Sequence, residues 1–263
     1  MWVRPSPGAP DGFICGSFAG DDWQVCKDHV RQRLGLETFQ NAKVLQRAHV
    51  EHTSAPQREH DTTKKAAALR LWHEAETPRG TIVEAYLNSR RLDLPDDIAG
   101  DVIRFHSACP WREGETTIRV LAMIAAMRSL HTDELVGIHR TRLTADGRKV
   151  DRRMLGGAAG AAIKLDGDAT VTSGLSIGEG IETCLSARQI GLRPIWALGS
   201  AGAIANFPVL AGVETLTLLA ENDEASRRAI DLCKERWLAA RREVIIATPL
   251  IGGDLNDALR GAA

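Results

Sequence analysis

Long hydrophobic runs are missing from this chain of 263 residues. A membrane-spanning helix needs roughly twenty consecutive apolar residues, and no stretch approaches that length. The first residues also lack the apolar segment of a signal peptide. We therefore expect a cytoplasmic protein with no membrane partner. An excess of one charge is missing too, because the formal net charge is −1. Any binding of nucleic acid must then depend on a local basic patch.

Cysteine is scarce and irregularly spaced. Five cysteines are scattered along the chain and no C-x-x-C pair occurs. An odd, scattered set argues against a disulfide framework and against a zinc ribbon. Cys15, Cys26 and His29 could supply three ligands, but structural zinc takes four, usually in tight pairs. We expect no zinc in this chain.

The remaining composition is that of a soluble globular protein, with 44% hydrophobic and 25% charged residues. Composition shifts divide the chain into four parts. We expect a small N-terminal segment at 1–40, a polar linker at 41–63, a helical hairpin with a basic β subdomain at 64–168, and an α/β domain at 169–263. The hairpin comprises a helix over Lys64–Glu76 and a second helix that begins at Thr81, where Glu84 completes a capping-box pattern.

A basic β subdomain is predicted after residue 101. A strand that Pro110 ends is followed by a buried apolar strand, a turn at Thr132 and Asp133, and an alternating strand over ELVGIHRTRLT. Basic residues crowd this segment, and a run of glycine and alanine at 156–160 follows them. We predict that phosphates of a nucleic acid or nucleotide bind to Arg140, Arg142, Lys149, Arg152, Arg153 and Lys164. A solvated hairpin with ordinary surface charge is the alternative.

Acidic residues stand where three successive strands of the last domain should end. Glu179 follows an apolar run, Glu221 and Asp223 follow a second, and Asp254 and Asp257 come soon after a third. Alternating strands and helices predict a parallel sheet, in which such strand ends share one edge. Converging carboxylates suit Mg²⁺, or equally Mn²⁺. Each carboxylate alone could instead serve the start of a helix, but three successive clusters are harder to explain that way.

The sequences LSIGEG, LLAENDEAS and GGDLND together resemble the Toprim domain, which topoisomerases, primases and some nucleases share. The likeness is greatest to primase-like Toprim proteins of bacterial mobile elements and phages. It implies a four-stranded parallel sheet with flanking helices, preceded by a smaller α+β basic subdomain. The segment around SFAGDDWQVCKD extends the resemblance to the N-terminus, where it implies a remnant of a zinc domain. One departure is Glu221, where the family usually has aspartate.

The resemblance implies a primase-type nucleotidyltransferase. Glu179, Glu221 and Asp223 would be catalytic and would hold the metal with Asp254 and Asp257. The implied partners are single-stranded DNA, nucleoside triphosphates and a replicative helicase, in the replication of a mobile element. A metal-dependent Toprim nuclease and a degenerate module that binds nucleic acid or a replication partner remain open. A topoisomerase is disfavoured because the single tyrosine, Tyr86, lies in a predicted helix before the domain.

Overall fold

The computed structural model describes residues 2–5, 13–16, 23–35 and 55–261. The chain divides into two compact units, residues 1–59 and 60–263. In the first unit, β1 (Trp2–Pro5) pairs antiparallel with β2 (Phe13–Gly16), and α1 (Trp23–Arg33) follows. Phe13, Cys26 and Val30 are buried there. Within the described ranges, every helix is too short or too polar to span a bilayer.

In the described part of the second unit, two helices precede the large sheet. The first, α3 (Ala55–Glu74), begins nine residues before the predicted Lys64, inside the segment assigned to the linker. The second, α4 (Ile82–Ser89), begins as predicted: the Thr81 hydroxyl accepts a hydrogen bond from the Val83 amide. The Glu84 carboxylate reaches back to the Gly80 amide, at 2.8 Å, rather than to that of Thr81. Unpaired amides at the helix start are thus satisfied by side chains, as capping requires.

Four antiparallel strands form the next part of the unit: β3 (Ile103–Glu113), β4 (Thr116–Ser129), β5 (Leu135–Leu143) and β6 (Lys149–Gly156). The predicted hairpin between β4 and β5 is confirmed. The prediction that Pro110 ends its strand is wrong, because Pro110 lies inside β3 opposite Arg119. A register shift between His106 and Cys109 and the position of β3 on a sheet edge explain why a residue without an amide proton is tolerated there.

The rest of the chain alternates strands and helices, starting with β7 (Ala161–Lys164) and a 3₁₀ turn at Asp168–Thr170. The order is then β8 (Gly174–Gly178), α5 (Ile181–Gln189), β9 (Ile195–Ala197), α6 (Ala201–Ala205), β10 (Thr215–Leu219), α7 (Glu224–Ala239), β11 (Glu243–Ala247) and α8 (Leu255–Gly261). Strands β9, β8, β10 and β11 lie side by side and parallel, which confirms the predicted four-stranded sheet.

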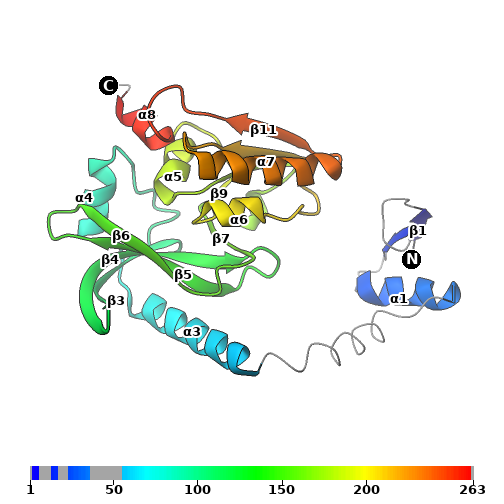
Figure 1. The fold of residues 1–263 in the computed structure, drawn as a ribbon, viewed down its shortest axis with the longest axis horizontal. Coiled ribbons are helices and arrows are strands. Elements are labelled where there is room, and N and C mark those ends of the chain that lie inside the picture. The colour runs from blue at the N-terminus through cyan, green and yellow to red at the C-terminus, as the bar shows by residue number, and fades with distance from the viewer. Residues whose placement is uncertain (1, 6–12, 17–22, 36–54, 262–263) are drawn as a thin grey trace. The chain divides into compact units, whose positions relative to one another are not determined.

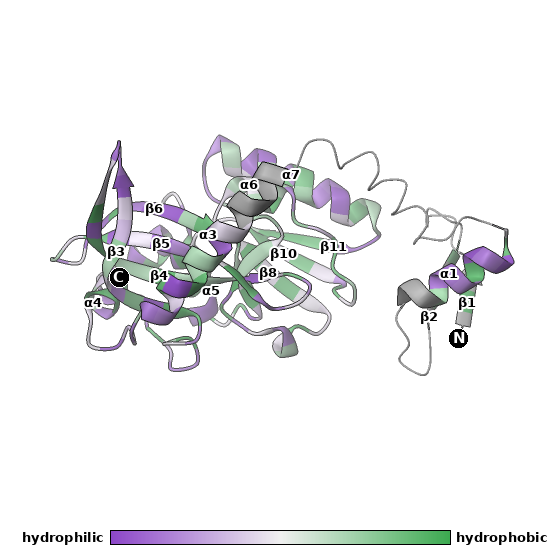
Figure 2. Ribbon diagram, turned by 90° about the horizontal axis from the view of Figure 1, so that it is seen from below, coloured by the Kyte–Doolittle hydropathy of each residue, from purple (hydrophilic) through white to green (hydrophobic). Residues whose placement is uncertain are grey.

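One continuous sheet of nine strands joins the two halves of this unit (Figure 1). Strand β7 makes the junction, since it pairs antiparallel with β4 on one side and with β9 on the other. Figure 2 shows hydrophobic residues along β8 and β10 and an alternation of hydrophobic and hydrophilic residues along α7, whose buried side includes Ile230, Cys233 and Trp237. The apolar side of α3, with Leu71 and Trp72, packs in a cluster with β3, β4 and β5.

A buried ion-pair cluster holds the segment after β7 and the start of β9 against α5. The Asp166 side chain is 0% exposed. Its Oδ1 accepts hydrogen bonds from Arg188 Nε, at 3.1 Å, and from Arg193 Nε, at 2.8 Å. Its Oδ2 accepts one from the Ile195 amide at 3.0 Å. A buried charge with this many donors is stable only while the donors remain, so Asp166 is a point at which the fold can be broken.

Replacing this carboxylate should therefore be costly. We expect Asp166→Asn to lower the free energy of unfolding by about 3–5 kcal/mol, because the buried Arg188 guanidinium loses its buried counter-charge and keeps only the exposed Asp97. Asp96 provides the control, since its side chain is 97% exposed and pairs with Arg79. Asp96→Asn should cost less than about 1 kcal/mol. Urea unfolding of the parent and both variants measures the difference, and equal costs would contradict the assignment.

Candidate metal and nucleotide site

Three carboxylates follow the carboxyl ends of parallel strands. Glu179 comes directly after β8, while Glu221 and Asp223 lie in the loop between β10 and α7. Because β8 and β10 are parallel neighbours, these residues lie at the same edge of the sheet. Asp223 is the N-cap of α7, and its Oδ1 accepts a hydrogen bond from the Ser226 amide at 2.8 Å. One oxygen of Asp223 thus has the role at the start of a helix that was the alternative to metal binding. Its other oxygen is left available as a metal ligand.

Glu221 lies at the centre of the acidic group. Its pKa is raised to about 7, first by burial and then by the negative charges of Glu179, Asp254 and Asp223, in that order. A hydrogen bond from the Thr183 hydroxyl, at 3.3 Å, acts in the opposite direction. Each of the three predicted motifs therefore places a carboxylate within electrostatic reach of Glu221, which is left with an excess of negative charge around it.

The third acidic motif forms a tight turn at the start of α8. Asp254 Oδ1 accepts a hydrogen bond from the Asp257 amide at 2.8 Å, and Asp257 Oδ2 accepts one from the Gly253 amide at 3.2 Å. Asn222, between the two acids of the second motif, donates from its amide to Gly253 O at 2.7 Å. The second and third motifs are thus bonded together. Asp254 acts on Glu221, whereas the bonds of Asp257 shape the turn.

Basic residues from β6 reach the acidic edge. Arg152 Nη2 lies 2.7 Å from Glu179 Oε1, and the Glu179 side chain is only 12% exposed. Lys149 Nζ lies 2.8 Å from Glu182 Oε1, which also accepts a hydrogen bond from the Tyr86 hydroxyl. Burial alone would raise the pKa of Glu182, but the Lys149 ammonium and the Tyr86 hydroxyl outweigh it and lower that pKa to about 2.

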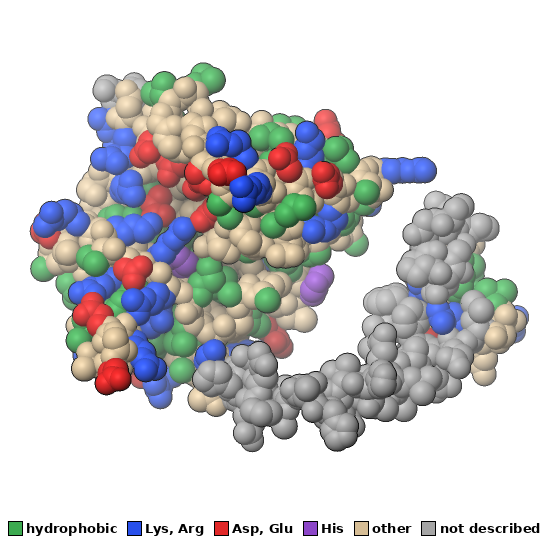
Figure 3. Space-filling view, in the orientation of Figure 1, with side chains coloured by type: hydrophobic (Ala, Val, Ile, Leu, Met, Phe, Trp, Pro, Cys, Tyr) green, Lys and Arg blue, Asp and Glu red, His purple; other side chains and the backbone are tan. Residues whose placement is uncertain are grey.

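The six predicted basic residues do not form one patch. Arg140 and Arg153 are cross-strand partners, so they share one face of the sheet, and both lie over the Trp111 ring. Arg142 is on this face too, paired with Glu113. Arg152 faces the opposite way, toward Glu179. Figure 3 shows basic and acidic side chains intermingled over the strand region of the large unit.

Lys164 is apart from both groups. Its side chain is 2% exposed, and its ammonium lies 2.9 Å from Asp133 Oδ1 and 2.6 Å from Asp168 Oδ1. It also lies over the Trp196 ring. Two carboxylates neutralise this lysine where β7 joins the two halves of the sheet, so the contacts of Lys164 are structural ones.

The residues fit a divalent cation by their donor chemistry. Mg²⁺ and Mn²⁺ prefer oxygen ligands, and Glu221 has the carboxylates of Glu179, Asp254 and Asp223 within electrostatic reach. In the ranges 2–5, 13–16, 23–35 and 55–261, however, no three histidine, cysteine, aspartate or glutamate side chains are close enough together to hold an ion. For a cation to bind, the carboxylates would have to move closer together, and the ion pair between Arg152 and Glu179 would have to weaken.

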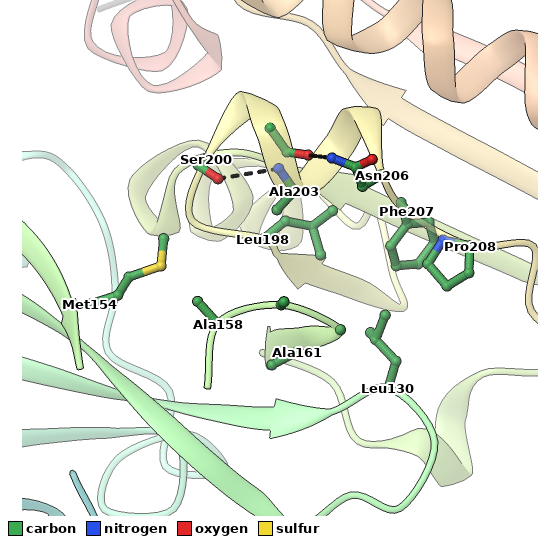
Figure 4. Close-up of a pocket in the computed structure, with 13 residues that line it drawn as sticks. Leu130, Met154, Ala158, Ala161, Leu198, Ser200, Ala203, Asn206, Phe207 and Pro208 are labelled. Carbon is green, nitrogen blue, oxygen red and sulfur yellow. Dashed lines mark hydrogen bonds between the residues drawn. The ribbon is translucent and has the colours of Figure 1, made fainter. Parts of the chain in front are cut away.

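A tight turn follows β9. Gly199 has φ of 82° and its amide donates to Glu179 O, which explains the glycine. Figure 4 shows the pocket beside this turn, where Ser200 and Asn206 on one side face Ala158 and Ala161 on the other. The Ser200 hydroxyl already accepts from the Ala203 amide, and the Asn206 amide donates to Gly202 O. The pocket has a volume of about 300 Å³ and is lined mainly by apolar residues.

Sequence reasoning missed several residues around the acidic edge. Thr183 and Arg90 carry no motif, and Tyr86 was considered only as a nucleophile. His139 is buried, and burial with the nearby charges of Arg152 and Lys149 lowers its pKa to about 4, so its imidazole is neutral. The alternating strand pattern signalled that His139 and Arg140 face opposite ways, but not which face meets the acids.

Family comparisons agree with this geometry. Residues 174–263 match the family model described as "Toprim domain", and residues 62–165 match a "Domain of unknown function (DUF7146)". No curated protein matches the sequence. The "DnaG primase catalytic domain bound to ssDNA" is similar in structure, with a TM-score of 0.55 and 15% identity over 77% of this chain and 76% of that one.

Two further solved structures extend the comparison. A DNA primase domain from Pseudomonas aeruginosa has a TM-score of 0.54 at 14% identity, over 75% of this chain and 74% of that one. The zinc-binding and RNA polymerase domains of the Aquifex aeolicus primase give 0.50 at 14% identity, over 98% and 75%. Residues 174–263 thus form a Toprim domain. More particularly, the fold of the chain resembles that of DNA primase domains.

The charge imbalance at Glu221 predicts how stability varies with pH. The folded state raises the pKa of this carboxyl from 4.5 to about 7, so folding is favoured by protonation and stability falls as the pH rises through that window. Glu221→Gln removes the charge. We expect the variant to match the parent near pH 4 and to exceed it by about 1–3 kcal/mol above pH 7, because one pKa unit corresponds to about 1.4 kcal/mol. Urea unfolding across this range, without divalent metal, measures it.

Glu182 provides a control of opposite sign. Its pKa is lowered from 4.5 to about 2, so its stabilising effect is present above pH 4.5 and is lost as the pH falls toward 2. Glu182→Gln should be destabilised at pH 7, with a deficit that shrinks on acidification. A Glu221→Gln variant that also loses stability at pH 7 would contradict the charge imbalance.

Proposed function

We propose that this protein is a primase-type nucleotidyltransferase that makes RNA primers on single-stranded DNA with a divalent cation. The observation that supports this most is the position of Glu221, at the end of a parallel strand and within electrostatic reach of Glu179, Asp254 and Asp223. A cation held by these oxygens, Mg²⁺ or Mn²⁺, would neutralise charge on a transferred phosphoryl group. The replication of a mobile element, with a helicase partner, is the setting we propose for it.

The chain's own residues have separate tasks in this proposal. Glu179, Glu221 and Asp223 supply carboxylate oxygens, with Asp254 beside them. Arg152 and Lys149, on the β6 face toward the acids, are placed to attract the triphosphate of an incoming nucleotide. Arg140, Arg142 and Arg153, on the opposite face, are placed to bind the DNA backbone. Asp257 then contributes through the turn it stabilises, and Lys164 through the sheet junction.

A non-catalytic module is the second candidate, and one observation favours it. Arg152 already occupies a carboxylate oxygen of Glu179, so this residue is neutralised without a metal. Such a module would bind nucleic acid or a replication partner through the same surfaces. Nuclease activity is a further possible outcome, since a metal site of this kind can also activate water.

Primer synthesis on the purified full chain separates these functions. We expect labelled ribonucleotides to enter short RNA products when single-stranded DNA and Mg²⁺ are both present. Glu221→Asp should keep or raise this activity because it restores the family's usual side chain, and Glu221→Gln should reduce it at least about a hundredfold because the amide lacks the charge that offsets the cation. Glu224→Gln is the control, since Glu224 is 71% exposed and pairs with Arg228.

Other outcomes of this assay are decisive as well. If the DNA is shortened in a metal-dependent way and no RNA products form, the protein is a nuclease and not a primase. If neither reaction occurs and Glu221→Gln does not change DNA binding, the result favours the non-catalytic module.

The basic face that Arg140, Arg142 and Arg153 share can be tested through salt dependence. We expect the double variant Arg142→Ala and Arg153→Ala to bind single-stranded DNA more weakly and to lower the slope of log K against log salt by about 1.4, because each lost phosphate contact removes about 0.7. Arg227→Ala with Arg228→Ala, on α7, removes the same charge elsewhere. Fluorescence anisotropy at several salt concentrations measures the slopes. An equal fall in both double variants would overturn the assignment.

A further inference from the structure

Asn256 is a fully buried polar residue between the two acids of the third motif. Its Nδ2 donates to Arg90 O and to Ser186 Oγ, each at 3.1 Å. Ser186 Oγ donates its own proton to Glu182 O at 2.9 Å, so toward Asn256 it can only accept. The opposite orientation of the amide would bring its oxygen against Arg90 O. The two donated bonds therefore fix the orientation of this side chain.

The other end of the same amide has no partner. Among the residues described, the buried Asn256 Oδ1 receives no hydrogen bond. An unpaired buried carbonyl oxygen destabilises the folded state, and an apolar side chain of similar size would avoid that loss. The asparagine is thus suited to this position by its two donated bonds rather than by packing.

Those bonds attach α8 to two other helices. Arg90 is the C-cap of α4, and Ser186 lies in α5. Asp254 stands immediately before α8, in the turn closed by the Asp257 amide. The Arg90 guanidinium also attracts Asp254. Asn256 therefore sets where the start of α8 lies relative to α4 and α5, and with it where the Asp254 carboxylate lies.

A second asparagine holds the same turn from the other side. Asn222 Nδ2 donates to Gly252 O at 2.7 Å, in addition to the bond from its backbone amide to Gly253 O. Asn222 lies between Glu221 and Asp223, so this bond links the turn directly to the second acidic motif. The Asp254 turn is thereby held from α4 and α5 on one side and from the β10–α7 loop on the other.

We propose that Asn256 is a positioning residue of the metal site, which fixes α8 so that the Asp254 carboxylate stays beside Glu221 and can join the oxygen ligands of a divalent cation. Asn222 assists from the opposite side. This inference rests on the proposed metal role of Glu221. It assigns no chemical step to Asn256, which acts through Asp254.

Calorimetric titration of the full chain with MgCl₂, and separately with MnCl₂, tests the inference. We expect Asn256→Ala to weaken metal affinity about tenfold or more, the size of effect found when groups that orient metal ligands are removed. Asn222→Ala, at an exposed position, should weaken it less, about threefold, because the backbone bond to Gly253 remains. Asn206→Ala is the matched control: its amide makes the same kind of bond, 2.8 Å to Gly202 O, within α6. This control should bind metal as the parent does.

Thermal unfolding of each variant without metal separates positioning from stability. A purely structural role would lower the melting temperature of Asn256→Ala and leave its metal affinity at the parent value, and that result would overturn the inference while the proposed function stands. If Asn256→Ala does not fold, Asn222→Ala decides, and parent-like affinity there overturns the inference. A parent that binds neither metal at millimolar concentration overturns the inference and the metal role of Glu221 together.

Discussion

Repulsion between carboxylates at one edge of the sheet is the constraint on which the surrounding structure depends. The contacts around these carboxylates reduce that repulsion. Burial and then the negative charges of Glu179, Asp254 and Asp223 raise the pKa of Glu221 to about 7. Around it, the structure provides partial compensation only: Arg152 for Glu179, a capping bond for Asp223, and a turn for Asp254. The compensation stops at the residue in the middle. An acidic group left in this condition is suited to a positive ligand, and that is the reason for assigning it a metal.

The adjoining antiparallel strands bring basic side chains to the acidic edge of the sheet. A single sheet crosses from β6 to β11 through the short strand β7, so the face that presents Arg152 and Lys149 is held in fixed register with the strands that present Glu179 and Glu221. Because side chains alternate along β6, neighbouring arginines have different surroundings: Arg152 meets an acid, whereas Arg153 lies over Trp111. In the proposed function, one basic strand would in this way bind a nucleotide on one side and a nucleic-acid strand on the other.

Much of the α/β half could be predicted from the sequence because its signals are local. Apolar runs such as Thr215–Leu219 that stop at acidic pairs indicate buried parallel strands, and each of the four predicted strands is present. The N-cap at Thr81 is equally local. The failure at Pro110 has a tertiary cause, since only the edge position of β3 makes a proline acceptable there. The start of α3 was missed because residues 55–63 are polar and show no helical period.

The acidic residues of the site could be predicted from the sequence. The basic and polar side chains that contact them could not. Motif spacing brings Glu179, Glu221 and Asp223 to one edge, but nothing in a run of arginines says that Arg152 turns inward and Arg142 outward. That division depends on which face of β5 and β6 packs on α4 and α5, a non-local fact. Asn256 was likewise read only as part of a motif, because its bonds to Arg90 and Ser186 join segments 166 and 70 residues apart.

The strand β7 has one more consequence, which concerns how this protein can be divided. The boundary between the two predicted domains was placed at residues 168 and 169, after β7. A fragment that starts there would leave the hydrogen-bonding edge of β9 uncovered, with Trp196 and Leu198 beside it, although both are almost fully buried in the intact unit. Open apolar strand edges invite intermolecular pairing. The α/β half would then aggregate on expression alone, whereas a fragment that begins before Ala161 would carry its own edge cover.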